Sequence, residues 1–389
     1  MDHPIEETFL TSLKLTNFRS YQSFALKCDQ RHVVLTGANG AGKTNILEAL
    51  SFLSPGRGMR RAAYDLVARS AERGGDGTFA IHTELSGISG PVSIGTGVQT
   101  GSNGLVEPGR KVRINGANAL TSERLLDHAR LLWLTPANDG LFTGATADRR
   151  RFLDRMVLAL DPLHGRRVTD FEKAMRSRNR LLEDPRCEPQ WLEAVELQMS
   201  ELGAAIVIAR LQFTSALAAQ FATAERAGPF PQADLALGGS LEATVQAHGD
   251  VDDAGHLEDF YSKTLRDGRH KDRAAGRTLH GPHRTDLFVR HRAKDMPAAL
   301  CSTGEQKALL IGLVLAHARL VAHTTGAAPF LLLDEIAAHL DRERRASLFS
   351  LIDDLGGQAW LTGTDQSLFE AMGERAQCFH VEEGVITPV

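Results

Sequence analysis

The stretch Gly37-Ala38-Asn39-Gly40-Ala41-Gly42-Lys43-Thr44 decides the fold, because it separates two segments of different periodicity. Before it, residues 33–36 (Val-Val-Leu-Thr) form a short apolar run that stops at a glycine, which is typical of a buried strand. After it, apolar residues recur at offsets that form one helical face: Ile46, Leu47, Leu50 and Leu53. Pro55 and Gly56 end that pattern. The chain here is predicted to run strand, loop, helix.

The eight residues match the phosphate-binding pattern G-x-x-x-x-G-K-[ST] in the structural context that the pattern requires. Glycines let consecutive backbone N–H groups turn around a phosphate, and the helix N-terminus adds its positive dipole end. Lys43 would reach the β- and γ-phosphate oxygens, and Thr44 would offer a hydroxyl to Mg²⁺. A glycine-rich turn without a ligand is the competing interpretation, and both flanks argue against it.

A second element of the same chemistry lies near the other end of the chain, in Leu331-Leu332-Leu333-Asp334-Glu335. An apolar strand that ends in two acids is expected in an ATPase: Asp334 would hold Mg²⁺ and Glu335 would polarise the attacking water. Without the phosphate loop, a strand end at a solvated acidic turn would be an equal explanation. We therefore predict an ATPase with Glu335 and Lys43 as catalytic residues and Thr44 and Asp334 as metal ligands.

Patterns elsewhere predict an α/β fold with a helical second part. Residues 9–36 read as strands, residues 72–116 as glycine-dense antiparallel hairpins, and residues 118–228 as helices, the longest over about 189–227. Residues 233–276 suggest loops and one helix. From residue 300 the α/β pattern returns, and both α/β portions should share one sheet. The expected division is 1–134 and 278–389 for the ATPase lobe, and 135–277 for the helical lobe.

Composition narrows the class of protein. With 389 residues, 42% apolar and 24% charged, the chain is long and apolar enough for sizeable cores, which excludes disorder over its whole length. Four cysteines lie far apart, with neither disulfide nor zinc spacing, so a reducing cytoplasm is expected. The N-terminal residues do not resemble a signal peptide, and no stretch approaches 18 uninterrupted apolar residues. We expect neither secretion nor a membrane span.

Charge is distributed unevenly around a formal net charge of −4. Residues 148–180 hold ten Arg and Lys against five acids, and residues 266–294 hold nine against three, whereas residues 331–389 hold four against eleven. Either basic segment could be a solvated, internally ion-paired helix face, but two of them in one ATPase favour a DNA-binding face. Arg57, Arg60 and Arg61, just past the phosphate-loop helix, are further candidates.

Further segments carry a family resemblance. Ser302-Thr303-Gly304-Glu305 opens a predicted helix and resembles the signature motif of ABC-type ATPases, and Asp341 stands where that superfamily has its D-loop aspartate. The chain also resembles the RecF family, close relatives of SMC heads, in segments that follow that family's order: residues 15–21, 37–45, 134–136, 149–154, 281–287, 302–307 and 332–341. Two of these, R-R-x-F-L-D and G-P-H-R-x-D, are absent from generic ABC ATPases.

The resemblance implies an ABC-type P-loop ATPase lobe, made of a mixed sheet with flanking helices and antiparallel hairpins, plus a helical lobe. It adds Asn45, Ser302, Gly304 and Asp341 to the nucleotide-binding residues, with Ser302 and Gly304 acting on a partner subunit's nucleotide. It implies slow, DNA-stimulated hydrolysis, ATP-dependent homodimerisation on single-stranded, gapped or junction DNA, and loading of RecA with RecR and, in some bacteria, RecO. Arg19 would lie near the base or ribose, or be a surface arginine. No glutamine loop is recognisable, and Thr364 is a candidate γ-phosphate contact.

Three other classes stay open from the sequence. An ABC subunit that energises a membrane transporter usually has a much shorter helical insertion than the one between Thr44 and Ser302. An SMC head with a long coiled-coil arm would need sustained heptads, which residues 118–228 lack. A scaffold that binds ATP without hydrolysing it would show no turnover with DNA present.

Overall fold

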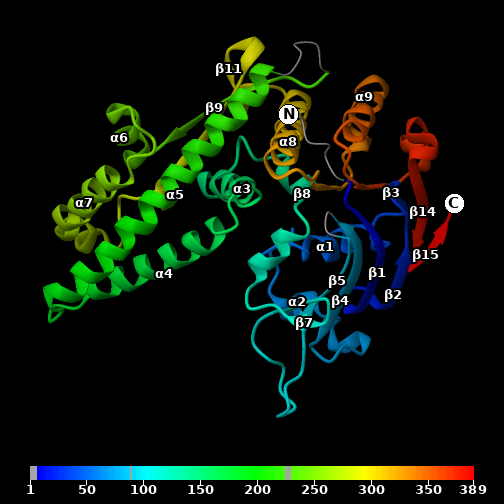
Figure 1. The fold of residues 1–389 in the computed structure, drawn as a ribbon, viewed down its shortest axis with the longest axis horizontal. Coiled ribbons are helices and arrows are strands. Elements are labelled where there is room, and N and C mark those ends of the chain that lie inside the picture. Colours follow the sequence, from blue (N-terminus) through cyan, green and yellow to red (C-terminus); the bar gives the residue numbers. More distant parts are fainter. Residues whose placement is uncertain (1–6, 88–89, 224–228) are drawn as a thin grey trace. The chain divides into compact units, whose positions relative to one another are not determined.

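The structure is a computed structural model that describes residues 7–87, 90–223 and 229–389. Contacts divide the chain into two compact units (Figure 1). Unit 1 comprises Met1–Asp139, Ala227–Phe230 and Leu310–Val389, and unit 2 comprises Gly140–Arg226 and Pro231–Leu309. Each unit is described by itself below.

Unit 1 contains a six-stranded sheet that combines both ends of the chain, in the order β15-β14-β3-β13-β12-β8. All neighbours pair in parallel except β14 and β15. The strands are β3 (His32–Thr36), β8 (Leu131–Leu134), β12 (Phe330–Leu333), β13 (Ala359–Gly363), β14 (Ala376–Glu382) and β15 (Val385–Pro388). Strands β3, β12 and β13 are buried at every position, as continuous apolar runs in a parallel sheet require. The prediction that both α/β portions share a sheet is confirmed.

A second sheet of unit 1 is antiparallel, with the order β2-β1-β4-β5-β6-β7. Its strands are β1 (Phe9–Phe18), β2 (Tyr21–Lys27), β4 (Phe79–Gly87), β5 (Gly90–Val98), β6 (Lys111–Ile114) and β7 (Ala117–Asn118). Strands β4 to β6 come from the glycine-dense segment 72–116 and pair antiparallel, so the expected hairpins are confirmed. Strand β8, by contrast, lies inside residues 118–228, where we expected helices. Its four residues are too few to show a period of their own.

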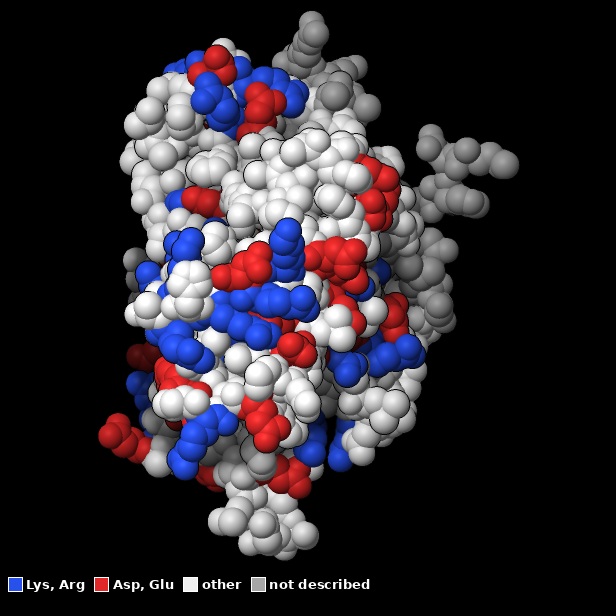
Figure 2. All heavy atoms as spheres, turned by 90° about the vertical axis from the view of Figure 1, so that its left-hand side faces the viewer, with Lys and Arg blue, Asp and Glu red and all other residues white. Residues whose placement is uncertain are grey.

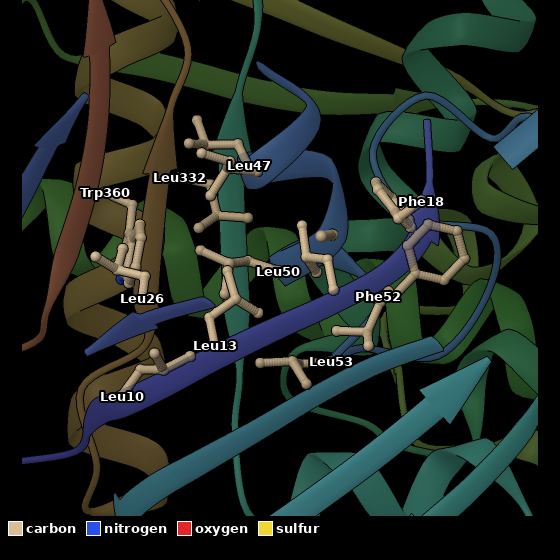
Figure 3. Close-up of a cluster of buried hydrophobic side chains, with 14 of the residues drawn as sticks. Leu10, Leu13, Phe18, Leu26, Leu47, Leu50, Phe52, Leu53, Leu332 and Trp360 are labelled. Carbon is tan, nitrogen blue, oxygen red and sulfur yellow. The ribbon is translucent and has the colours of Figure 1, made fainter. Parts of the chain in front are cut away.

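The core of unit 1 joins both sheets to the helix α1 (Lys43–Ser51). Figure 3 shows side chains of β1, β2, β12, β13 and α1 and of the residues after α1 meeting in one cluster: Leu10, Leu13, Phe18, Leu26, Leu47, Leu50, Phe52, Leu53, Leu332 and Trp360. Trp360 is fully buried, and its indole N–H donates to Gln358 Oε1 at 3.1 Å. The same amide oxygen accepts from the Leu10 N–H at 3.0 Å, which ties the two sheets together. The helix that follows the phosphate loop is therefore held in place by packing against both sheets.

The remaining helices of unit 1 flank the sheets: α2 (Tyr64–Val67), α9 (Arg342–Asp353) and the larger part of α8 (Thr303–Thr325). By length and composition, α8 and residues Pro189–Phe221 of the helix α5 could cross a membrane. In α8, however, 78% of the most apolar 18-residue stretch is buried inside the structure, as in the core helix of a folded protein. In α5 the charged residues Glu196 and Arg210 are ion-paired inside unit 2.

Unit 2 is built on α3 (Thr146–Leu158), α4 (His164–Glu183), α5 (Pro189–Thr223), α6 (Ser240–His248) and α7 (Ala254–Ala275). It also holds a three-stranded antiparallel sheet with the order β11-β10-β9, made of β9 (Ala233–Gly238), β10 (Asp286–His291) and β11 (Met296–Pro297). The long helix was predicted over about 189–227; the structure describes it from Pro189 to Thr223, and the rest of the predicted range lies outside the described residues. The expectation of loops and one helix for residues 233–276 was wrong, because this segment forms a strand and two helices.

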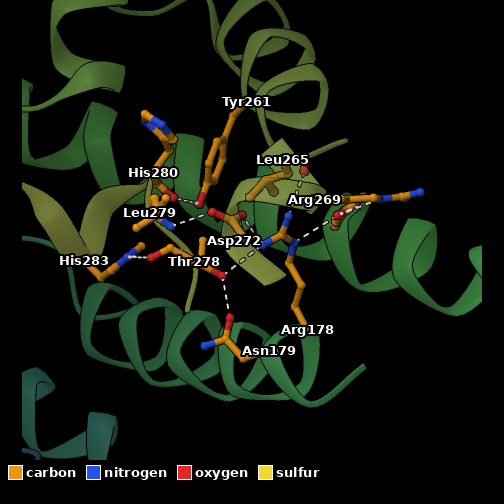
Figure 4. Close-up of polar contacts among 11 residues, drawn as sticks. Arg178, Asn179, Tyr261, Leu265, Arg269, Asp272, Thr278, Leu279, His280 and His283 are labelled. Atoms are coloured by element: carbon orange, nitrogen blue, oxygen red, sulfur yellow. Dashed lines mark hydrogen bonds and ion pairs between the residues drawn. The ribbon is translucent and has the colours of Figure 1, made fainter. Parts of the chain in front are cut away.

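A buried ionic network holds the helices of unit 2 together (Figure 4). The Arg178 side chain is fully buried and donates to Glu196 on α5 (2.9 Å) and to Asp272 on α7 (2.6 Å). It also donates to Thr278 Oγ1 at 3.0 Å and to the Leu265 carbonyl at 2.7 Å. Arg178 comes from α4, so a cation of the first basic segment serves the interior of the protein.

The unit boundaries differ from the expected division at 134/135 and 277/278. Residues 278–309 belong to unit 2, because β10 pairs with β9 along its whole length. Residues 135–139 belong to unit 1, and the second boundary lies inside α8, between Leu309 and Leu310.

Candidate functional site

The phosphate loop connects β3 to α1 and needs its glycines for steric reasons. Gly37, Gly40 and Gly42 have φ angles of 143°, 84° and 113°, which side chains rarely adopt. A Cβ at Gly37 would lie 2.2 Å from the Val381 carbonyl oxygen, and one at Gly42 would lie 2.6 Å from the Tyr21 hydroxyl. At Gly40 it would meet nothing within 4 Å. Ala38, Asn39 and Gly40 thus form an exposed tip above a tightly packed base.

Lys43 begins α1 and lies over the loop. Its Nζ donates to the carbonyl oxygens of Gly37 (2.6 Å) and Ala38 (2.9 Å). Burial lowers the pKa of Lys43, and the nearby carboxylates of Glu335 and Asp334 oppose that shift. The ammonium group is therefore held beside the loop and close to both acids of the second motif.

Thr44 and Asp334 lie far apart in the sequence and meet in the structure. The Thr44 hydroxyl donates to Asp334 Oδ1 at 2.9 Å, and the Thr362 hydroxyl donates to the same oxygen at 2.8 Å. Thr362 lies on β13, the neighbour of both β3 and β12. Sequence reasoning considered Thr364 and missed Thr362, whose position beside Asp334 depends on the strand order.

Glu335 sits just past the end of β12 in a left-handed conformation, with φ of 55°. Non-glycine residues adopt this region at a cost of order 1 kcal/mol, and such strain concentrates at functional sites. Its N–H donates to Thr362 Oγ1 at 2.9 Å. Thr362 therefore fixes both acids, since it donates to one and accepts from the backbone of the other.

The oxygen set at this point suits a hard divalent cation. A threonine hydroxyl and a carboxylate whose oxygens are 2.9 Å apart are ligands of the kind that Mg²⁺ takes in nucleotide sites, where phosphates and waters complete the shell. Among the described residues, no group of three or more His, Cys, Asp or Glu could hold a metal ion on its own. The residues present thus fit a magnesium ion shared with a nucleotide.

A cluster of charges surrounds the second turn of α1. Glu48 is fully buried and accepts two hydrogen bonds from Arg19 (2.9 and 2.6 Å) and one from Arg60 (3.1 Å). Arg60 also donates to Asn45 Oδ1 at 2.9 Å, and the Asn45 amide donates to Ser20 Oγ at 2.9 Å. Arg19 therefore anchors the end of β1 to α1, which is a structural role.

The signature-like segment lies in unit 2, where Ser302 caps α8. The Glu305 carboxylate accepts from the Ser302 N–H (3.0 Å) and hydroxyl (2.9 Å), and it pairs with Lys294. The hydrogen bond from Lys294 and those from Ser302 lower the pKa of Glu305 to about 2. Ser302, Thr303 and Gly304 are exposed, and a Cβ at Gly304 would meet nothing within 4 Å. This helix end is therefore capped and exposed to solvent.

Asp341 lies in unit 1 and caps α9, because its carboxylate accepts from the Arg344 N–H at 2.8 Å. It is exposed and stands six residues after Glu335, with one short 3₁₀ turn (Ala337–His339) between them. The cap explains its residue type locally; its second carboxylate oxygen lies 3.7 Å from Arg344 Nε, and the side chain is 59% exposed.

The two family-specific segments meet inside unit 2. Arg149 on α3 pairs with Asp286 through two hydrogen bonds of 2.7 and 2.8 Å, and Arg150 donates to the Thr285 carbonyl at 3.0 Å. Asp154 pairs with Arg210 on α5 at 2.8 Å. These motifs assemble the second unit, a role that their sequences alone did not reveal.

Comparisons with known proteins agree with this geometry. Residues 9–387 match the family described as RecF/RecN/SMC N terminal domain. The chain is 59% identical to the DNA replication and repair protein RecF of Rhizobium rhizogenes, over 98% of this chain and 99% of that one. It is 60% identical to RecF of Brucella suis, over 97% and 95% of the two chains.

Solved structures show the same fold. A structure titled recombination mediator protein RecF-ATPrS in the RecFOR pathway matches all of both chains with a TM-score of 0.83 at 21% identity. A RecF-ATP structure matches 98% of this chain and 99% of that one with a TM-score of 0.79 at 21% identity. The SMC head of Pyrococcus furiosus gives 0.52 at 16% identity, over 98% and 96%. Family profile, relatives and fold agree: the chain belongs to the RecF family of DNA replication and repair proteins.

Proposed function

We propose that this protein is an ATP-dependent DNA-binding recombination mediator, in which ATP closes a homodimer on gapped or junction DNA and hydrolysis opens it. The observation that carries the proposal is the junction of Thr44 with Asp334 at 2.9 Å, beside Lys43 and Glu335. This contact joins residues 290 positions apart in the sequence, which supports a nucleotide site at this point.

The nucleotide site would work by positioning. Backbone N–H groups of residues 37–45 would surround the β-phosphate, and Lys43 would exchange its carbonyl acceptors for charged phosphate oxygens, which bind an ammonium more strongly. Thr44 and Asp334 would hold Mg²⁺, which neutralises phosphate charge. Glu335 would orient and polarise the attacking water. Slow, DNA-stimulated hydrolysis is proposed because the useful product is a conformational state.

The dimer would be completed by the exposed segment before and at the start of α8. Ser302 and Gly304 are open to a neighbour's γ-phosphate, and the Leu300 side chain is 70% exposed two residues earlier. Shifting a dimer equilibrium from 1:99 to 99:1 needs about 5.5 kcal/mol. Two nucleotides would each supply about half of it, which one or two charge-assisted hydrogen bonds provide.

The decisive experiment is sedimentation of Glu335→Gln with ATP and Mg²⁺. The amide keeps the site's shape but removes the base, so we expect ATP to bind and the dimer to persist. Lys43→Ala is the matched control, which should neither bind nucleotide nor dimerise. A monomeric Glu335→Gln protein with ATP bound would contradict the proposed clamp.

The cellular role follows from the relatives. The 56–60% identical proteins are named for DNA replication and repair. We propose a cytoplasmic protein that promotes RecA loading together with RecR and, in some bacteria, RecO. An ABC subunit of a membrane transporter is not favoured, since these full-length relatives are RecF proteins. Footprinting on gapped and blunt duplex DNA, with ATP and with ADP, would test the DNA preference.

A further inference from the structure

The outward face of α7 carries a row of cations that the proposed nucleotide site does not use. The helix buries Leu257, Tyr261 and Leu265 in the core of unit 2. The exposed Lys and Arg residues, called here the α7 stripe, are Lys263, Arg266, Lys271 and Arg273, with Arg277 just after the C-cap Gly276. Offsets of three and four place most of them on one side of the helix. From Lys263 to Arg273 the row is about 15 Å long.

Among the described residues, most of these charges have no carboxylate partner. Across residues 7–87, 90–223 and 229–389, Lys263, Arg266, Lys271 and Arg277 make no ion pair. Arg273 donates through Nε to the Leu182 carbonyl, not to a carboxylate. Within residues 263–277, Asp267 is the one exposed acid, because Asp272 is buried against Arg178. A field of positive charge therefore faces solvent along this helix.

The other cations of the two basic segments are mostly paired. Carboxylates lie within ion-pair distance of Arg149, Arg151, Arg166, Arg167, Lys173, Arg176, Arg269, Arg290, Arg292 and Lys294, although Arg166 and Lys173 share the carboxylate of Asp170. Most cations of the segment 148–180, which the sequence made a candidate DNA face, therefore already have an acidic neighbour. The free positive charge gathers on the second segment instead.

Figure 2 shows the side of the protein on which Figure 1 labels α7. Lys and Arg side chains gather across the middle of this face, with acidic side chains at the margins of the group. Apolar anchors, which form the centre of most protein interfaces, are scarce on α7 itself. Among the described residues of α7, Phe260 is the one large apolar side chain that is exposed, at 37%.

We propose that the α7 stripe binds the phosphate backbone of duplex DNA. A row about 15 Å long faces about four phosphates of one strand, since each strand carries a phosphate every 3.4 Å or so along the axis. Lys and Arg contacts of this kind fix the position of a protein on DNA without reading its sequence. The inference rests on the proposed DNA-binding function and names the surface that carries it.

The test compares two double variants with the same change in charge. Arg266→Gln/Lys271→Gln removes two cations of the stripe, and Lys173→Gln/Arg176→Gln removes two exposed cations of α4 that already have carboxylate partners. Each is titrated, with ATP and Mg²⁺ present, against a labelled gapped duplex and a labelled blunt duplex by fluorescence anisotropy over a series of salt concentrations. All four residues are exposed, and ATP-dependent dimerisation of each variant reports that it is folded.

We expect the stripe variant to bind both duplexes about tenfold or more weakly at about 0.1 M salt, with a log–log salt slope shallower by roughly 2. The α4 variant should stay within about twofold of the wild type. A second stripe variant, Lys263→Gln/Arg277→Gln, should reproduce the first.

Equal DNA affinities of the stripe and α4 variants would overturn the inference. It would also be overturned if the stripe variant kept its DNA binding but lost binding of RecR, because that result would assign the stripe to a protein partner. If the wild type bound ATP but no DNA, the proposed function itself would fail. The two failures are therefore distinguishable.

Discussion

At the scale of single residues, Thr362 joins the two halves of the candidate site. Its hydroxyl donates to Asp334 and accepts from the Glu335 N–H, so one side chain sets the position of both acids. It lies at the middle of a sheet whose strands come from opposite ends of the chain. The geometry of the candidate site thus depends on a residue outside the recognised motifs.

We expect Thr362→Val to bind ATP nearly as well as the wild type but to hydrolyse it at least about tenfold more slowly. Valine keeps the shape of the side chain but removes its hydroxyl. The Glu335 N–H then loses its acceptor and Asp334 loses one donor, at a cost of about 1–3 kcal/mol. Nucleotide affinity and single-turnover hydrolysis are measured separately. Thr362→Ser should restore hydrolysis, and failure of that rescue would argue against a positioning role.

His283 gives unit 2 a pH dependence. Burial, with Arg150 and Arg284 nearby, lowers the pKa of His283 to about 4 from an ordinary value near 6.5, although its hydrogen bond to the Thr278 carbonyl opposes the shift. The fold therefore favours the neutral ring. Its contribution to stability is complete above pH 6.5 and is lost as the pH falls toward 4.

Lowering the pH from 7 to 4 should therefore reduce the free energy of unfolding by up to about 3 kcal/mol through this residue. His283→Gln, which can still donate to the Thr278 carbonyl, should flatten that part of the pH profile in denaturant unfolding. The exposed His270→Gln is the control. Identical profiles for wild type and His283→Gln would contradict the assignment.

At the scale of elements, α9 follows a capping residue for which we propose a second role. Asp341 caps the helix through the Arg344 N–H, and it stands where the superfamily's D-loop aspartate is expected. Its exposure is what makes the second role physically accessible.

Asp341→Ala should lower the free energy of unfolding by about 1 kcal/mol through loss of the cap, and should also slow ATP turnover. Asp341→Ser keeps a capping oxygen without the charge, so stability should recover while turnover stays low. Thermal unfolding and ATPase assays of both variants separate the roles. If Asp341→Ser recovered its ATP turnover, helix capping would be the one role left for Asp341.

At the scale of the whole molecule, a net charge of −4 excludes DNA binding by overall attraction. Binding must come from local patches of positive charge. The salt dependence of the affinity then reports how many phosphates those patches contact. If about six phosphates are neutralised, the logarithm of the wild-type affinity should fall against the logarithm of salt concentration with a slope of roughly −5. Anisotropy titrations with gapped duplex measure it, and a flat response would contradict DNA binding altogether.

The sequence by itself determined the local chemistry of this protein. The phosphate loop, the acid-tipped strand, the cap at Ser302 and the long helix from Pro189 depend on neighbouring residues and short periods, so they could be recognised without a fold. The short strand β8 and the strand β9 could not, because four to six residues between helical segments carry too little pattern.

Only the tertiary structure decided which groups meet. Strand order put Thr362 beside Asp334, and helix packing took Arg178 into the interior while leaving the α7 stripe facing solvent. A count of charges along the chain cannot distinguish a buried, paired cation from one that faces solvent. Electrostatic pairing depends on distances of a few ångströms in space, and the fold sets those distances for residues tens to hundreds of positions apart.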